Sequence, residues 1–334
     1  MTKTPPFSPE APRVVEILAF PEVQVLDVTG PLQVFASANE VTSPSRSSPP
    51  YAVTVVAASG GPVACSAGLR LVTDALSDGQ APIDTLIVPG GRGVTAAAAD
   101  RDLVAWVRTR AAAARRTASV CTGAFLVAAT GLLDGRRVAT HWERCRELAA
   151  GFPAITVEPD PIFVRDGPMW SSAGVTAGID LCLALVEEDL GRAVALAIAR
   201  DLVVHLKRPG GQSQYSAMLS LQRSSRFAEL HEWMRENLAG DLTLARLADR
   251  SGMSERSFSR RYVAETGVTP ARAVERLRIE AARTLLSEAK WPVKSVAKRC
   301  GFQNEETLRR SFLRLVRVSP QDYRRSWRRT WKAG

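Results

Sequence analysis

Residues 248–270 read ADRSGMSERSFSRRYVAETGVTP, and residues 297–320 read AKRCGFQNEETLRRSFLRLVRVSP. The two stretches repeat one another, with Gly252 matching Gly301 at an offset of 49 residues. Each predicts a helix, a tight glycine turn and a second helix, which begins after the N-cap residue Ser254 in one copy and Asn304 in the other. Two helices joined in this way make a helix-turn-helix, whose second helix can enter the major groove of DNA.

Polar and apolar side chains separate along the two second helices. Phe258 and Tyr262 in one copy, and Leu308 and Phe312 in the other, are four residues apart and are expected in the core. The opposite faces are expected to read DNA; they carry Arg256, Ser257, Ser259, Arg260, Glu306, Thr307, Arg309 and Arg310. Arginine can bond bidentately to guanine, and glutamate can accept from the cytosine amino group. Any one arginine can instead contact phosphate or remain solvated.

The distribution of charge supports a polyanionic partner for this repeated region. Residues 241–334 contain 22 Lys and Arg against 10 Asp and Glu, whereas residues 1–240 contain 22 and 24. The whole positive excess of the chain, +10, therefore lies in the last 94 residues. Double-stranded promoter DNA is the expected partner, read in two successive grooves about 34 Å apart. A continuous helix over about residues 270–286 would hold the two copies together.

Length and composition limit the rest of the chain. With 334 residues and 46% hydrophobic residues, it is expected to form two domains around full cores. It has no apolar run long enough to span a membrane, and residues 1–12 predict a disordered tail. The odd number of cysteines and the three histidines predict neither a disulfide framework nor a structural metal site, and a cytoplasmic location is expected.

Short β-branched runs alternate with helical stretches in the first half, which predicts an α/β doubly wound, mostly parallel sheet. The predicted strands cover residues 14–20, 52–58, 85–88 and 117–120, and the predicted helices include 100–114, 175–190 and 192–206. This flavodoxin-like domain should extend over residues 13–208. A linker is expected at 209–224, followed by the all-α domain over 225–330.

Ser119-Val120-Cys121-Thr122-Gly123 (SVCTG) follows an apolar strand and opens a helix, as in a nucleophile elbow. A helix N-terminus at such a corner favours a thiolate, and the turn at 89–91 (PGG) can offer N–H groups to an oxyanion. Asp27 and His141 follow other strands, and strand ends in a doubly wound sheet converge on one crevice.

The C-terminal region resembles the AraC/XylS family of bacterial transcription regulators. The family's signature is visible in Gly301-Phe302, Leu308, Arg310, Phe312, Ser319-Pro320 and Tyr323-Arg324. Two positions depart from it: Leu313 replaces a usual basic residue, and Arg317 replaces a usual helix-ending glycine.

The N-terminal region resembles the ThiJ/PfpI group of the class I glutamine amidotransferase-like fold, on LDVTGP, PGG, SVCTGAF, THW and residues 172–185. Its motifs are most similar to the isonitrile hydratase branch. That resemblance implies catalytic roles for Asp27, Cys121 and Thr122. The fusion with an AraC-type reader resembles GlxA-like regulators, which implies that this domain senses a ligand or dimerises and has no catalytic turnover.

The two halves together predict a one-component transcription regulator without a cofactor. A small-molecule effector is expected to contact Asp27, Gly90, Gly91, Cys121, Thr122, His141 and Trp142. A homodimer is expected, with RNA polymerase as a partner if genes are activated. The alternatives are a ThiJ/PfpI-type enzyme using Cys121 and Asp27, and a non-specific nucleic-acid-associated protein.

Several of these site residues also have purely structural interpretations. Cys121 can be a small buried hydrophobic residue, Asp27 a helix N-cap and His141 a buried strand histidine. Residues 90–93 (GGRG) lack the Walker spacing, so nucleotide binding is not expected.

Overall fold

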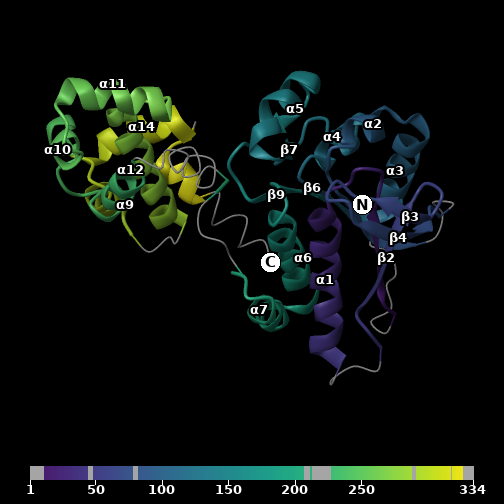
Figure 1. The fold of residues 1–334 in the computed structure, drawn as a ribbon. Coiled ribbons are helices and arrows are strands. Elements are labelled where there is room, and N and C mark those ends of the chain that lie inside the picture. The colour runs from purple at the N-terminus through teal and green to yellow at the C-terminus, as the bar shows by residue number, and fades with distance from the viewer. Residues whose placement is uncertain are drawn as a thin grey trace. The chain divides into compact units, whose positions relative to one another are not determined.

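The computed structural model describes residues 11–43, 48–77, 82–206, 211–212, 227–287, 291–316 and 318–325. The chain divides into two compact units, Met1–Arg208 and Pro209–Gly334 (Figure 1). Most of the expected tail, most of the expected linker, and Arg317 lie outside the described residues.

The first unit is built on an eight-stranded sheet in the order β3-β4-β2-β1-β5-β6-β10-β9, counted over the described residues. Only the outer pairs, β3–β4 and β9–β10, are antiparallel. The α/β doubly wound, mostly parallel sheet is thereby confirmed. The strands are β1 (Arg13–Leu18), β2 (Tyr51–Ala57), β3 (Gly61–Ala64), β4 (Arg70–Ala75), β5 (Ile83–Val88), β6 (Ala114–Val120), β9 (Phe163–Asp166) and β10 (Met169–Ser172), with a separate parallel pair β7 (Arg137–Val138) and β8 (Thr156–Val157).

Helices cover both faces of this sheet (Figure 1). On one face α1 (Val25–Thr42), α6 (Ala177–Leu190) and α7 (Arg192–Asp201) pack together. On the other lie α2 (Val94–Ala99), α3 (Arg101–Ala113) and α4 (Gly123–Ala129), and α5 (Cys145–Gly151) follows β7. The central strand β5 is buried along its whole length, including Asp84 and Thr85 at its start. The helix predicted over 192–206 ends early because Val203 is left-handed, with φ 54°.

A buried ionic cluster holds the C-terminal end of α6 against the amino-terminal ends of the central strands. The guanidinium of Arg116 pairs with Asp189 on α6, and both side chains are almost fully buried. Arg115 bonds Asp84 on β5 at 2.7 Å, and the Tyr51 hydroxyl donates to Asp189 at 2.9 Å. Since α6 begins near the carboxyl edge of the sheet, this cluster fixes its far end.

The second unit contains two helix-turn-helix motifs, as predicted. Its helices are α9 (Ala228–Glu236), α10 (Leu244–Arg250), α11 (Glu255–Thr266), α12 (Pro270–Ser287), α13 (Val293–Arg299) and α14 (Glu305–Val316). The motifs are α10–α11 and α13–α14, and α12 is the predicted connecting helix. The first half of α12 packs Leu277 into the core of one motif, and its second half packs Ala282 into the core of the other.

In the described part of the chain, no helix has both the length and the apolar character needed to cross a membrane.

Candidate sensor site and nucleic-acid interface

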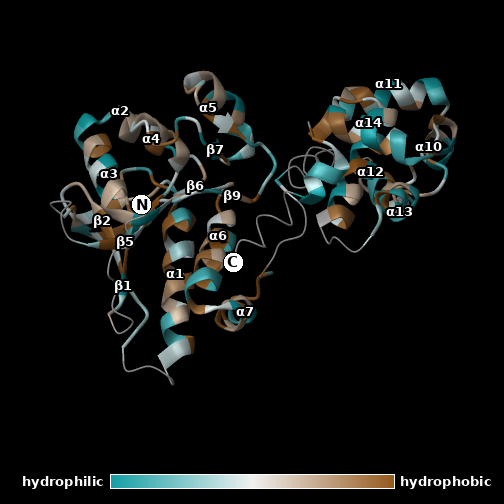
Figure 2. Cartoon of the chain, turned by 180° about the vertical axis from the view of Figure 1, so that it is seen from behind, coloured by the Kyte–Doolittle hydropathy of each residue, from teal (hydrophilic) through white to brown (hydrophobic). Residues whose placement is uncertain are grey.

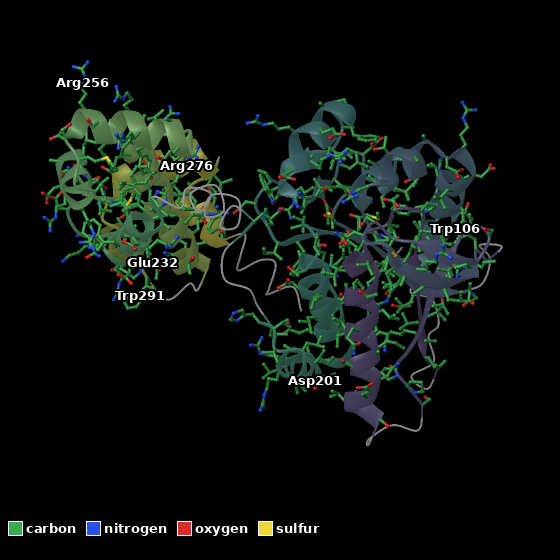
Figure 3. All side chains as sticks on the ribbon, viewed as in Figure 1. Trp106, Asp201, Glu232, Arg256, Arg276 and Trp291 are labelled. Carbon is green, nitrogen blue, oxygen red and sulfur yellow. The ribbon has the colours of Figure 1, made fainter. Side chains whose placement is uncertain are left out.

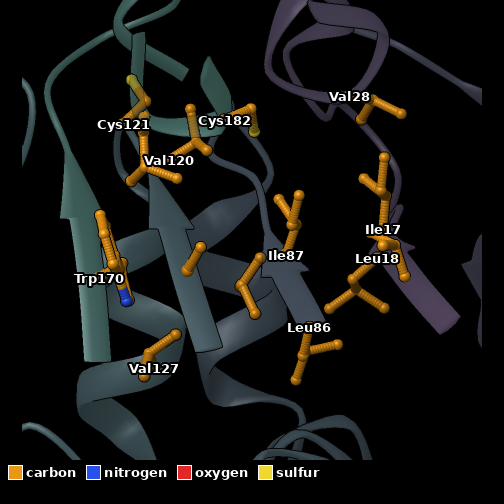
Figure 4. Packing of buried hydrophobic residues seen from close by; sticks show 14 of the residues in the cluster. Ile17, Leu18, Val28, Leu86, Ile87, Val120, Cys121, Val127, Trp170 and Cys182 are labelled. Carbon is orange, nitrogen blue, oxygen red and sulfur yellow. The ribbon is translucent and has the colours of Figure 1, made fainter. Parts of the chain in front are cut away.

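Cys121 occupies the sharp turn between β6 and α4, as the elbow motif predicted. Its backbone is left-handed, with φ 57°, and only 7% of the residue is exposed. The Cys121 N–H donates to the carbonyls of Ser172 and Ala173 at 3.1 Å each, and the Thr140 hydroxyl donates to the Cys121 carbonyl at 2.8 Å. These bonds fix the strained turn at the carboxyl edge of the sheet, at the tip of β6 (Figure 4).

The side chains of two further residues at this edge accept hydrogen bonds from the turn after β5. The carboxylate of Asp27 accepts the N–H of Gly90 at 3.0 Å, and the Thr122 hydroxyl accepts the N–H of Gly91 at 3.0 Å. The expectation that this turn offers free N–H groups to an oxyanion is therefore wrong. The N-cap interpretation of Asp27 is also wrong, because Gln24 occupies the N-cap position of α1 and Asp27 lies inside its first turn.

The site favours neutral side chains. Burial raises the pKa of Asp27 to about 7. Burial, followed by the charge of Asp27, raises the pKa of Cys121 to about 12. The thiolate expected from the helix N-terminus is therefore not favoured, because desolvation outweighs the hydrogen bonds from Thr122 and Val175. The pair combines a protonated thiol with a carboxyl group that titrates near neutral pH.

His141 lies beside this site, not in a strand. It caps the short 3₁₀ helix Trp142–Arg144, where its Nδ1 accepts the Glu143 N–H at 3.4 Å, so the strand interpretation of His141 is wrong. Its ring packs so closely on Gly174 that a Cβ there would come within 2.2 Å of the His141 Cδ2. Burial lowers the pKa of His141. Trp142 is 40% exposed.

Sequence reasoning missed Val175, which lies one residue before Thr176, the N-cap of α6. Its backbone is left-handed, with φ 49°, and its backbone N–H favours the ionised forms of Asp27 and Cys121. A β-branched residue rarely adopts this conformation, so the sequence carried no signal for it. The other four cysteines are buried thiols, and the described residues contain no group of three or more side chains able to hold a metal.

The predicted reading face of the first motif lies in solvent. The N-cap hydroxyl of Ser254 accepts the Ser257 N–H at 3.4 Å and starts α11, while Phe258 and Tyr262 are fully buried. Arg256 and Arg260 are exposed, Ser257 and Ser259 are half-buried, and Figure 3 shows Arg256 extending away from the domain. Figure 2 shows that α11 is largely hydrophilic.

The second motif repeats this arrangement with a different charge pattern. The Asn304 side chain accepts the Thr307 N–H at 2.8 Å and the Thr307 hydroxyl at 3.0 Å. The exposed carboxylate of Glu306 pairs with Arg309 at 2.7 Å and with Arg310 at 3.7 Å. The free protein therefore holds both arginines next to a carboxylate, an arrangement that the sequence did not reveal.

Comparison with known proteins finds a matching family model for each half of the chain. Residues 13–188 match the model of the DJ-1/PfpI family. The chain belongs to the DJ-1/PfpI family. Residues 247–326 match the model of a helix-turn-helix domain, so this family member combines a DJ-1/PfpI domain with a helix-turn-helix domain. The resemblances inferred from the sequence are confirmed for both domains.

Relatives of this DJ-1/PfpI member include regulators and an enzyme. An HTH-type transcriptional regulator from Mycobacterium tuberculosis is 35% identical, over 74% of this chain and 96% of the relative. The HTH-type transcriptional regulator CdhR of Pseudomonas aeruginosa is 30% identical, over 82% of both chains. Isonitrile hydratase of Pseudomonas putida is 38% identical, but over only 53% of this chain and 72% of its own.

Among solved structures, a ThiJ/PfpI family protein from Pseudomonas syringae is 32% identical with a TM-score of 0.52, covering 63% of this chain and 84% of its own.

Proposed function

We propose that this protein is a sequence-specific, DNA-binding transcription regulator whose DJ-1/PfpI domain senses a small molecule and contributes a dimer interface. The observation that carries the proposal is the pair of capped helices α11 and α14, each presenting an exposed polar face on a strongly basic domain. The alignments with the two regulator relatives support the proposal, because they are long enough to include both domains.

On DNA, α11 and α14 would lie in successive major grooves. Arg256, Arg260 and Arg310 would donate to guanine or to phosphate, and Glu306 could accept from cytosine. Further contacts to bases and phosphates would come from Ser257, Ser259, Thr307 and Arg309. Each phosphate contact releases a counterion, so affinity should fall steeply with salt.

The sensor site would lie around Asp27, Cys121 and Thr122, bordered by Gly90, Gly91, His141 and Trp142. Its chemistry suits a small, uncharged polar effector, because Asp27 Oδ1 is buried without a hydrogen-bond partner among the described residues and the thiol is neutral. An effector changes transcription only if it binds the active arrangement more tightly than the inactive one. A homodimer would carry four reading helices, and an activator would also contact RNA polymerase.

The second candidate is a ThiJ/PfpI-type enzyme, such as an isonitrile hydratase. The retained Asp27, Cys121 and Thr122 and the 38% identity to isonitrile hydratase favour it. The occupied N–H groups of Gly90 and Gly91 and the protonated thiol favour sensing over turnover. Loss of hydratase activity in Cys121→Ala with an unchanged promoter response would favour the enzyme.

Binding by the full chain to a random DNA pool tests the proposal. Repeated selection at physiological salt should enrich two motifs, and the enriched duplex should bind at least about 10³-fold more tightly than random DNA. Equal affinity for both would instead favour a non-specific nucleic-acid-associated protein. Mapping the bound sites in cells would then identify genes whose products point to the effector.

A further inference from the structure

The loop between α9 and α10 meets the turn of the second helix-turn-helix motif at a junction formed by Leu238, Gly240, Arg278 and Gly301. The Arg278 guanidinium, on α12, donates to the carbonyl of Leu238 at 3.0 Å and to that of Gly240 at 3.2 Å. Both carbonyls belong to the loop between α9 and α10, and Leu238 packs on the apolar core that contains the first motif. The same guanidinium also lies against Gly301, in the turn of the second motif.

Gly301 shows how tight this junction is. A Cβ at Gly301 would lie 2.0 Å from the Leu238 carbonyl oxygen and 2.8 Å from Arg278 Nε. Its repeat partner Gly252 has nearly the same left-handed backbone, with φ 63° against 76°, but a Cβ there would meet nothing within 4 Å. The glycine of the second motif is thus required by its contact with the α9–α10 loop as well as by its own turn.

A second set of bonds ties the reading helix α14 to α12. Glu275, on α12, accepts a hydrogen bond from the hydroxyl of Ser311 and pairs with Arg314. Ser311 is buried on the side of α14 that faces α12. The second motif is therefore held from two sides, through Glu275 and through the junction.

We propose that Arg278 and Gly301 set the spacing between the two DNA half-sites that the protein accepts. The inference rests on the proposed function. One base pair adds about 3.4 Å of rise and about 35° of rotation along DNA. To follow such a shift, α14 would have to move relative to α11, which would break the close contact at Leu238. Arg278 and Gly301 act as positioning residues, since they need not touch DNA themselves.

The test is selection from a random DNA pool with the full chain, comparing wild type with Arg278→Ala, Gly301→Ala and Gly252→Ala. Wild type and Gly252→Ala should enrich two motifs at a single spacing. Arg278→Ala and Gly301→Ala should enrich the same motifs at several spacings. Dimerisation would add a second copy of the pair without altering the spacing within it.

A binding titration gives the second readout. Inserting one base pair between the motifs should weaken wild-type binding by about tenfold or more, but Arg278→Ala by less than about threefold. Variable spacing in the wild-type pool would overturn the inference. So would a single spacing with Arg278→Ala, which removes hydrogen bonds without the clash that endangers folding in Gly301→Ala. If the wild type enriched no motif, the proposed function would fail and this inference with it.

Discussion

The carboxylate of Asp27 accepts the N–H of Gly90 through one oxygen, at 3.0 Å, while its other oxygen is buried without a partner among the described residues. One half of the carboxylate therefore ties α1 to the turn after β5. Cys121 and the Val175 N–H lie near the same buried carboxylate and favour its ionised form. Holding the turn needs only the first oxygen, so Asp27 has a structural role that requires no catalysis.

Asp27 should make the first unit less stable as pH rises from about 4 to 7. Its pKa is about 7 in the folded protein, against 3.8 for an ordinary solvated aspartate, so the unfolded chain loses its proton first. The contribution of Asp27 to the free energy of unfolding is fully present below pH 3.8 and is lost as pH rises through 7. The free energy of unfolding, relative to Asp27→Asn, should fall by about 4 kcal/mol across this window. Denaturant unfolding at several pH values measures it, and parallel curves for the two proteins would contradict the prediction.

Asp27→Asn should also make Cys121 more reactive. The substitution removes the negative charge that helps to raise the thiol pKa, while the asparagine oxygen can still accept from Gly90. Alkylation of Cys121 by iodoacetamide at about pH 8, followed by mass spectrometry of its peptide, should be slow in wild type and faster in the variant. Cys182, which is fully buried, provides the internal reference. Equal rates would show that burial alone protects the thiol.

Arg260→Ala and Arg310→Ala should each weaken binding to the selected DNA by about 1–3 kcal/mol. Both side chains lie exposed, on α11 and α14, where a guanidinium can donate to a base or a phosphate. Arg192→Ala, an equal loss of charge in the first unit, should leave affinity unchanged. Fluorescence anisotropy measures all three, and unchanged affinity in both reading-helix variants would refute the assignment of this face.

Glu306→Gln should increase affinity for random DNA and reduce discrimination. The change releases Arg309 and Arg310 from their ion pairs and removes a negative charge from the face that is predicted to contact DNA. The salt dependence of binding should steepen accordingly. Glu229→Gln, on α9, changes the net charge equally and serves as the control. If both variants behave alike, net charge is sufficient to explain the effect and the ion pairs have no separate role.

Arg116→Ala should destabilise the first unit by about 3–5 kcal/mol, because it leaves Asp189 buried without its main cation. The matched control is Arg192→Ala, whose pair with Glu187 at 3.1 Å is exposed and should contribute at most about 1 kcal/mol. Urea unfolding followed by circular dichroism compares the two. Equal losses would mean that the buried cluster adds little to stability.

The sequence predicted the fold well where residue type and spacing determine structure. The repeat fixed both helix-turn-helix motifs because N-cap and core residues recur at the same positions, and Ser254 and Asn304 do cap α11 and α14. The β-branched runs located the central strands, but the first was extended two residues beyond the end of β1 at Leu18. The assignment of individual residues to effector or DNA contacts stays a prediction.

Sequence reasoning failed where the outcome depends on how distant groups meet. The SVCTG motif indicated an elbow but could not show that desolvation would outweigh the helix N-terminus at Cys121. The PGG turn suggested free donors, yet Asp27 and Thr122 from other parts of the chain occupy them. Arg278 gave no signal because an arginine on an amphipathic helix is ordinary, and only its contact across the junction gives it a role.

The connecting helix α12 contributes side chains to both apolar cores of the second unit. Unfolding of either motif would uncover one half of α12, so we expect the two motifs to melt in a single cooperative transition. A proteolytic cut within α12 should abolish both together. Deletion of either motif should therefore destabilise the other, whereas substitutions on the exposed faces of α11 and α14 should leave both motifs folded.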